Sequence, residues 1–157
     1  MSKIQCTCGE SLSNSSSPSP NLLTVFSINT VQQCLHRRPD ITLFEFETEE
    51  NERDYEYWYC PQCKRVHIVE NIPMGNIVKH YVPVTSGEAG PLDSVEGFYV
   101  FTNTEIYDAE EIDFNLTLAS YVAKFGPNHT FFYAPDTDSI YKPIDEDHYE
   151  LFYTVEE

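Results

Sequence analysis

The segment Tyr55-Glu56-Tyr57-Trp58-Tyr59-Cys60-Pro61-Gln62-Cys63 joins a run in which tyrosines alternate with Glu56 and Trp58 to a closely spaced cysteine pair. Such alternation is typical of a β-strand with one buried face, so residues 55–59 are expected to form a strand that leads into Cys60. The apolar residues that begin at Val66, and again those from 77 to 82, indicate that the chain continues as a hairpin. This stretch therefore predicts an antiparallel sheet with a cysteine-bearing turn.

A second cysteine pair lies near the N-terminus, in Cys6-Thr7-Cys8-Gly9. Four thiolates form a closed tetrahedral site of the kind that holds zinc, and tight turns let backbone amides face the sulfurs. Cys6, Cys8, Cys60 and Cys63 are therefore predicted to bind one structural Zn(II) ion that ties the N-terminus to the centre of the chain. A redox pair at Cys60 and Cys63, or cysteines without a metal, are the alternatives.

The Cys60 to Cys63 half of this set resembles a zinc knuckle of the zinc-ribbon class, which implies a structural zinc. Cys6 and Cys8 depart from the usual two-residue spacing, and Lys64 stands where a glycine is common. The 51 residues between the two pairs are also a long insertion, since compact ribbons have roughly 15 to 20. The candidates for a substitute ligand are His67, four residues after Cys63, and the neighbouring residues Cys34 and His36.

The net charge of −17 restricts the partners that this chain can have. Nucleic acid phosphates and anionic membranes are bound through Lys and Arg, so direct nucleic acid binding and membrane binding are not expected. The acidity is concentrated in two places: residues 45–59 carry seven acids against Arg53, and residues 80–157 carry sixteen acids against two lysines. The odd count of five cysteines fits metal binding in a reducing compartment, so a cytoplasmic location is predicted.

The expected fold class is α+β, with a predominantly antiparallel sheet and two short-to-medium helices. The first helix is predicted from Asn29 to just before Pro39, and the second from an Asp108–Glu111 capping box to Phe125 before Gly126-Pro127. A strand is expected over 41–46. The domain division places a zinc-ribbon-like N-terminal lobe at 1–82 with a serine-rich loop at 11–20, a connector at 83–97 and an acidic lobe at 98–157, which together can also form a single domain.

Clusters of carboxylates interleaved with tyrosines are the second chemical signal. Tyrosines anchor interfaces at low entropy cost, and a carboxylate array steers a basic partner by long-range attraction. The residues predicted to contact a partner are Glu49, Glu50, Glu52, Asp54, Tyr55, Tyr57, Asp136, Asp138, Asp145, Glu146 and Asp147.

No phosphate-binding loop, nucleophile elbow or zinc-protease motif occurs in the sequence. The preferred hypothesis is a non-enzymatic, acidic, zinc-binding protein that docks on a basic protein such as a nuclease, a toxin or a nucleic-acid-binding enzyme. In size and charge the chain is similar to small immunity proteins and anti-defence inhibitors. It would therefore act as an inhibitor of that type, and nucleic-acid mimicry is one form that this role can take. The alternatives are an accessory zinc-ribbon regulator or subunit of a nucleic-acid-processing machine, and an enzyme of unrecognised type.

Overall fold

The computed structural model describes residues 3–13, 19–51, 55–70, 77–84, 88–89, 95–145 and 148–156. Within these ranges a two-stranded hairpin lies beside a larger sheet. The strands of the hairpin are β1 (Lys3–Gln5) and β2 (Ser11–Ser13). The strands of the larger sheet are β3 (Leu22–Ser27), β4 (Tyr55–Tyr59), β5 (Val66–Glu70), β6 (Ile77–Pro83), β7 (Glu88–Ala89), β8 (Glu96–Thr102), β9 (Thr130–Ala134), β10 (Ser139–Pro143) and β11 (Tyr149–Val155).

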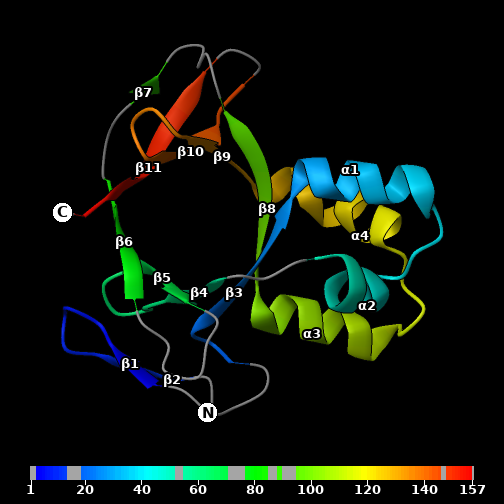
Figure 1. Cartoon of the computed structure of the whole chain (residues 1–157), viewed down its shortest axis with the longest axis horizontal. Coiled ribbons are helices and arrows are strands. Elements are labelled where there is room, and N and C mark those ends of the chain that lie inside the picture. The colour runs from blue at the N-terminus through cyan, green and yellow to red at the C-terminus, as the bar shows by residue number, and fades with distance from the viewer. Residues whose placement is uncertain are drawn as a thin grey trace.

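The larger sheet closes on itself. Its order is β10-β9-β8-β3-β4-β5-β6-β11, every pair is antiparallel, and β10 also pairs with β11, so eight strands form a closed barrel (Figure 1). The short β7 pairs with the first residues of β11. The register shifts by a bulge or irregularity in the β5–β6 and β10–β11 pairs. Such irregularities increase the local twist of the strands, which favours closure of an eight-stranded sheet into a barrel. The predicted antiparallel character is confirmed, but the closure was not part of the prediction.

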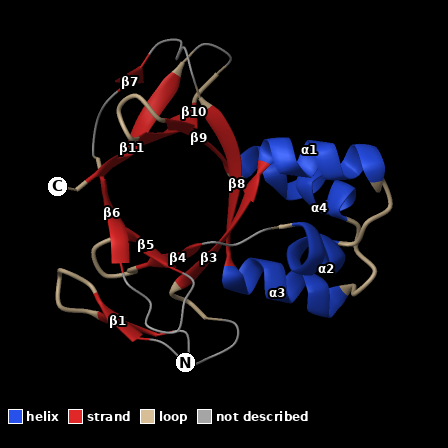
Figure 2. Ribbon diagram, viewed as in Figure 1, coloured by secondary structure: helices blue, strands red, loops and turns tan. Residues whose placement is uncertain are grey.

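Four short α-helices occur in the described residues, where two were predicted: α1 (Ile28–Arg37), α2 (Leu43–Glu45), α3 (Asn103–Ile112) and α4 (Leu118–Phe125). A π-helical turn (Phe46–Glu50) extends α2, and a 3-10 turn (Gly126–Asn128) follows α4. The helices gather on one side of the barrel, next to β3 and β8 (Figure 2). The first predicted helix is confirmed as α1, which is capped by Ser27, begins one residue before Asn29 and buries Val31 and Cys34.

The strand predicted over 41–46 is wrong, because this stretch begins a helix. Thr42 and Glu45 form a reciprocal capping box that starts α2, and this local bonding outweighs the strand preference of the apolar residues. The backbone amide of Leu43 donates to the carbonyl of Leu116 at 2.8 Å, which joins α2 to the chain before α4.

The single helix predicted from Asp108 onward is also wrong. Thr102 and Glu105 form the capping box of α3, and the helix ends at Asp113, whose side chain accepts a hydrogen bond from the amide of Asn115. Thr117 then caps a separate helix, α4. Short polar side chains that bond to their own backbone interrupt helices in this way, so a continuous apolar pattern is divided in two.

Two apolar cores form on the outside of the barrel. The larger core lies between the four helices and the strands β3 and β8, where Phe26 and Phe101 meet Ile106, Leu118 and Tyr121. A smaller core lies between the β1–β2 hairpin and the strands β4 and β5; its buried residues are Cys6, Leu12, Trp58, Cys60 and Val69. The side chains that alternate with these outward-facing residues therefore point into the barrel.

Strands from both predicted lobes pair in the one sheet, through β3 with β8 and β6 with β11. None of the helices in the described ranges is long and apolar enough to cross a membrane.

Candidate metal centre

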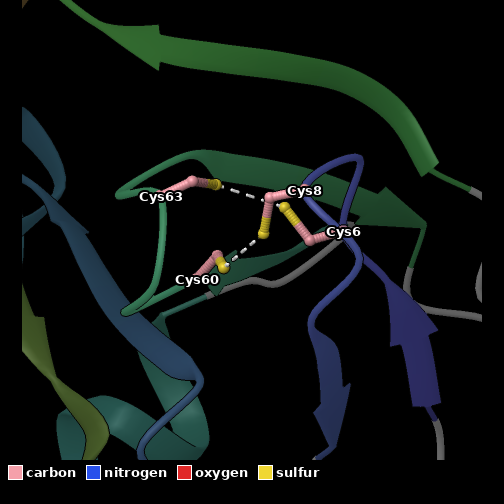
Figure 3. Close-up of side chains that lie close together, drawn as sticks. All are labelled: Cys6, Cys8, Cys60 and Cys63. Carbon is pink, nitrogen blue, oxygen red and sulfur yellow. Dashed lines mark hydrogen bonds between the residues drawn. The ribbon is translucent and has the colours of Figure 1, made fainter.

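Four cysteine sulfurs converge where the β1–β2 hairpin meets the β4–β5 turn (Figure 3). The Sγ atoms of Cys6 and Cys63 lie 3.4 Å apart and those of Cys8 and Cys60 lie 3.6 Å apart. All four sulfurs lie within 4.8 Å of one another, a set that could hold a metal ion. The structure thus brings together the four residues that the sequence singled out for metal binding.

Both turns are shaped by local backbone bonds. The amide of Lys64 donates to the carbonyl of Cys60 at 2.8 Å, and the amide of Cys60 donates to the carbonyl of Arg65 at 3.0 Å, which closes a tight loop around the pair. Lys64 has a φ of 67°, in the left-handed region where zinc knuckles commonly place glycine. Gly9, in the opposite turn, has a φ of 100°, a backbone conformation that favours glycine over residues with a side chain.

The hairpin core anchors the cluster at its buried side. Cys6 and Cys60 are buried, Cys63 is half-buried and Cys8 is exposed. The completely buried Leu12 and Trp58 fill the space between the hairpin and the barrel. An ion held by these cysteines would therefore join the hairpin to the β4–β5 turn beside this core.

His67 lies next to the cysteines on β5 and is completely buried. Its Nε2 is 3.3 Å from the sulfur of Cys6, and its Nδ1 is 2.6 Å from Nδ1 of His80. Burial, followed by the charge of His80, lowers the pKa of His67 to about 4, so the ring is neutral. In the neutral ring one nitrogen donates and the other accepts, so His67 is held between Cys6 and His80. Contacts of this kind can orient the ligands of a metal.

Arg65 supplies positive charge beside the cluster. Burial acts to raise the pKa of Cys63, but hydrogen bonds from the backbone and side chain of Arg65, with those from Cys6 and Cys60, lower it to about 6. The guanidinium is held in place by Glu156, to which Nη2 donates at 3.0 Å. By contrast, burial raises the pKa of Cys6 to about 12, so a bound cation would be needed to keep this sulfur as a thiolate.

The other candidate ligands lie elsewhere or contact the cluster differently. Cys34 is buried in the helical core and belongs to α1, as does the exposed His36. His67 contacts one of the four sulfurs, and the group that could hold an ion consists of cysteines only.

The predicted partner-binding residues between positions 49 and 57 are only partly accessible to solvent. Glu50 forms ion pairs with Arg37 at 3.1 Å and Arg38 at 3.2 Å, and Glu49 lies 3.6 Å from Arg38. Tyr55 is exposed, whereas Tyr57 is half-buried inside the barrel wall. Glu52 and Asp54 lie outside the described residues.

The predicted partner-binding residues of the C-terminal half also differ in their exposure to solvent. Asp136 and Asp145 are exposed, and Glu146 and Asp147 lie outside the described residues. Asp138 points inward: its Oδ1 accepts from the hydroxyls of Tyr81 at 2.7 Å and Tyr133 at 2.8 Å, and its Oδ2 lies 2.8 Å from Nζ of Lys79. This carboxylate therefore joins β6 to the β9–β10 turn, and only residues such as Asp136 and Asp145 face solvent.

Sequence reasoning missed three exposed apolar side chains on the helical side of the barrel, Phe44, Ile112 and Phe114, which we call the helical tip. The side chains of Phe44, Ile112 and Phe114 are 40%, 87% and 64% exposed, and the rings of Phe44 and Phe114 lie 5.3 Å apart. The signal was Asp113-Phe114-Asn115, whose polar residues break the helix and leave the ring between them outside both helical faces.

Comparison with known families matches residues 2–137 to a family described as a domain of unknown function, DUF8617. The chain belongs to the DUF8617 family. The match includes all four cysteines and the strands from β1 to β9. Neither the curated proteins nor the solved structures contain a match to this chain.

Proposed function

We propose that the protein is a non-enzymatic binding protein, stabilised by one structural Zn(II) ion, that docks through the helical tip on a basic surface of another protein. The zinc follows from the donor set. Thiolates favour soft metals, and a tetrahedral Zn(II) with Zn–S bonds of about 2.3 Å places its sulfurs about 3.8 Å apart. The separations of 3.4 and 3.6 Å in the cluster are close to this value.

The observation that carries the docking proposal is the exposure of the helical tip. Its three apolar side chains come from α2, the end of α3 and the turn before α4, and backbone bonds hold these segments together. The amide of Leu118 donates to the carbonyl of Ile41 at 2.9 Å, which fixes the turn against α2. A rigid apolar surface that a protein leaves in water is typical of an interaction site.

Carboxylates border the helical tip and define the chemistry of its partner. Asp108 lies one helical turn before Ile112, and Glu111 and Asp113 flank it; all three are exposed. In the described ranges no ion pair is formed by Asp108, Glu111 or Asp113. An apolar centre inside an acidic rim fits a basic surface with an apolar side chain at its middle, where attraction speeds the encounter and the apolar contact supplies affinity.

The net charge of −17 supports a nuclease, a toxin or a nucleic-acid-binding enzyme as the basic partner. Covering such a surface would block it, so an inhibitor is the role that we propose.

Four thiolates fill a tetrahedral coordination sphere, which suits a zinc ion of structural function.

The matched pair Ile112→Ser and Ile144→Ser tests the docking surface. Both isoleucines are exposed, at 87% and 56%, but Ile144 lies beside Asp145 in the other acidic region. We expect proteins captured from host lysate at low salt by the wild-type chain to elute with salt. Capture by Ile112→Ser should fall about tenfold, as for an interface anchor, and capture by Ile144→Ser should be unchanged.

The same experiment separates the two candidate faces. If Ile144→Ser or neutralisation of Asp145, Glu146 and Asp147 abolishes capture while Ile112→Ser does not, the docking surface is the C-terminal acidic region. Capture that is equal for all variants, or insensitive to salt, would contradict docking on a basic partner.

A further inference from the structure

A cavity of about 660 Å³ opens where the barrel wall separates between β3 and β4. Among the described residues these two strands pair only at Leu22 and Leu23, and the later residues of β3 pair with β8. Asn51 spans part of the gap, since its Nδ2 donates to the carbonyl of Val25 at 3.4 Å. The cavity has the size of a small-molecule site, and eight-stranded barrels are wide enough to hold one small ligand.

One part of the lining is apolar and aromatic, and the rest is mostly polar. Leu23 and Tyr57 are a cross-strand pair, and Val25 and Phe98 lie on the same side of their strands, opposite to the side that packs on the helices. All four line the cavity and are half-buried. Burial, followed by the charge of Tyr55, raises the pKa of Tyr57, as expected for a phenol in an apolar surrounding. The wall thus offers rings against which a flat apolar molecule could pack.

Within the part of the lining that the structure describes, the charged side chains already have partners. Arg37 and Glu50 form an ion pair at 3.1 Å, and Glu50 also contacts Arg38. The carboxylate of Glu56 accepts a hydrogen bond from the indole of Trp58 at 2.9 Å. A charged ligand would therefore have to compete with these partners for a counter-charge among the described lining residues, after giving up its own hydration, which is costly. Neutral hydrogen-bonding groups, such as those of Thr30 and Asn51, remain at the rim.

We propose that the barrel binds one uncharged aromatic small molecule in the cavity between β3 and β4. The ligand would lie against Tyr57 and Phe98, and its polar edge would face Asn51. This inference rests on the barrel wall and does not depend on the docking of a partner at the helical tip, which lies on the helices.

Two fluorescent probes that share a naphthylamine scaffold test the charge preference. N-phenyl-1-naphthylamine is neutral, and 8-anilinonaphthalene-1-sulfonate carries an added sulfonate. For the full-length protein at neutral pH we expect saturable binding of the neutral probe with one site per chain, and at least tenfold weaker binding of the sulfonate. Equal affinity for both probes, tighter binding of the sulfonate, or tighter binding of the cationic dye thioflavin T would overturn the proposal.

Variants locate the site. Val25→Trp fills the cavity and should weaken the neutral probe at least tenfold, whereas Phe114→Ala, which trims the helical tip, should change its affinity less than twofold. Phe98→Leu removes a ring from the wall while keeping it apolar, and should weaken binding several-fold even if Val25→Trp does not fold. Circular dichroism and thermal unfolding confirm that each variant is folded. Loss of probe binding in Phe114→Ala, with binding unchanged in a folded Val25→Trp or in Phe98→Leu, would place the probe on the surface and refute a site in the barrel.

Discussion

Removal of the metal is expected to release the β1–β2 hairpin from the barrel and to lower the stability of the protein by about 3 to 5 kcal/mol, because the ion contributes binding free energy directly to folding. Cys60→Ser should act similarly, since Cys60 is a buried member of the cluster. Trp58, the one tryptophan of the sequence, is completely buried beneath the hairpin and reports its release. A chelator should shift its emission to longer wavelength and lower the thermal midpoint by about 10 °C.

Cys34→Ser is the matched control for this experiment. Cys34 is as buried as Cys60 but lies in the helical core, next to β3 and β8 instead of β4 and β5. Elemental analysis should find one zinc per chain in the wild type and in Cys34→Ser, and markedly less in Cys60→Ser. An unchanged thermal midpoint and an unchanged tryptophan emission after chelation would contradict a structural metal, as would the absence of zinc from protein purified without chelator.

The four-cysteine cluster could be predicted because its members come in short local spacings. Cys6, Cys8, Cys60 and Cys63 come in two tight pairs, and no other arrangement of the cysteines offers four sulfurs of that kind. The residues that surround the cluster could not be predicted from the sequence. His67 and Arg65 contact the sulfurs because of the register of β5, and His80 joins them through a pairing between strands that spacing along the chain does not reveal.

Individual strands were predictable from alternation, but the closed barrel was not. Closure depends on β10, whose pairing with both β9 and β11 is a long-range choice that alternation leaves undetermined. The predictions for α2, α3 and α4 were wrong for a different reason. Thr42, Thr102 and Thr117 each cap a helix through a side-chain bond to the backbone, and these caps override the apolar periodicity on which the prediction relied.

Asp138 shows why charge along a sequence does not identify a binding surface. It was expected to face a partner together with Asp136, two residues earlier, but the turn between β9 and β10 directs the two side chains differently. Asp136 is exposed, whereas Asp138 accepts hydrogen bonds from Tyr81 and Tyr133 and pairs with Lys79. One carboxylate thus lies on the surface and the other joins strands of the barrel.

Asp138→Ala is therefore expected to destabilise the protein by about 3 kcal/mol, with a fall of roughly 6 to 12 °C in the thermal midpoint. The substitution leaves the buried hydroxyl of Tyr81 and the ammonium of Lys79 without their acceptor. It also places alanine at a φ of 49°, which the short polar side chain of aspartate tolerates better. Asp136→Ala, in the same turn but exposed, should change stability by less than about 0.5 kcal/mol.

The pH dependence of stability gives an independent test of the same carboxylate. Burial alone would raise the pKa of Asp138, but hydrogen bonds from Lys79, Tyr81 and Tyr133 outweigh it and lower the pKa below that of the unfolded chain. The unfolded state then binds a proton first as the pH falls, so the stabilisation by Asp138 is complete above about pH 4 and is lost as the pH drops through the folded-state pKa. Asp138→Asn keeps the turn conformation but cannot titrate, so urea unfolding midpoints below pH 4 should fall less steeply for this variant than for the wild type. Parallel acid profiles for the two proteins would mean that the carboxylate is not held by the three donors in solution.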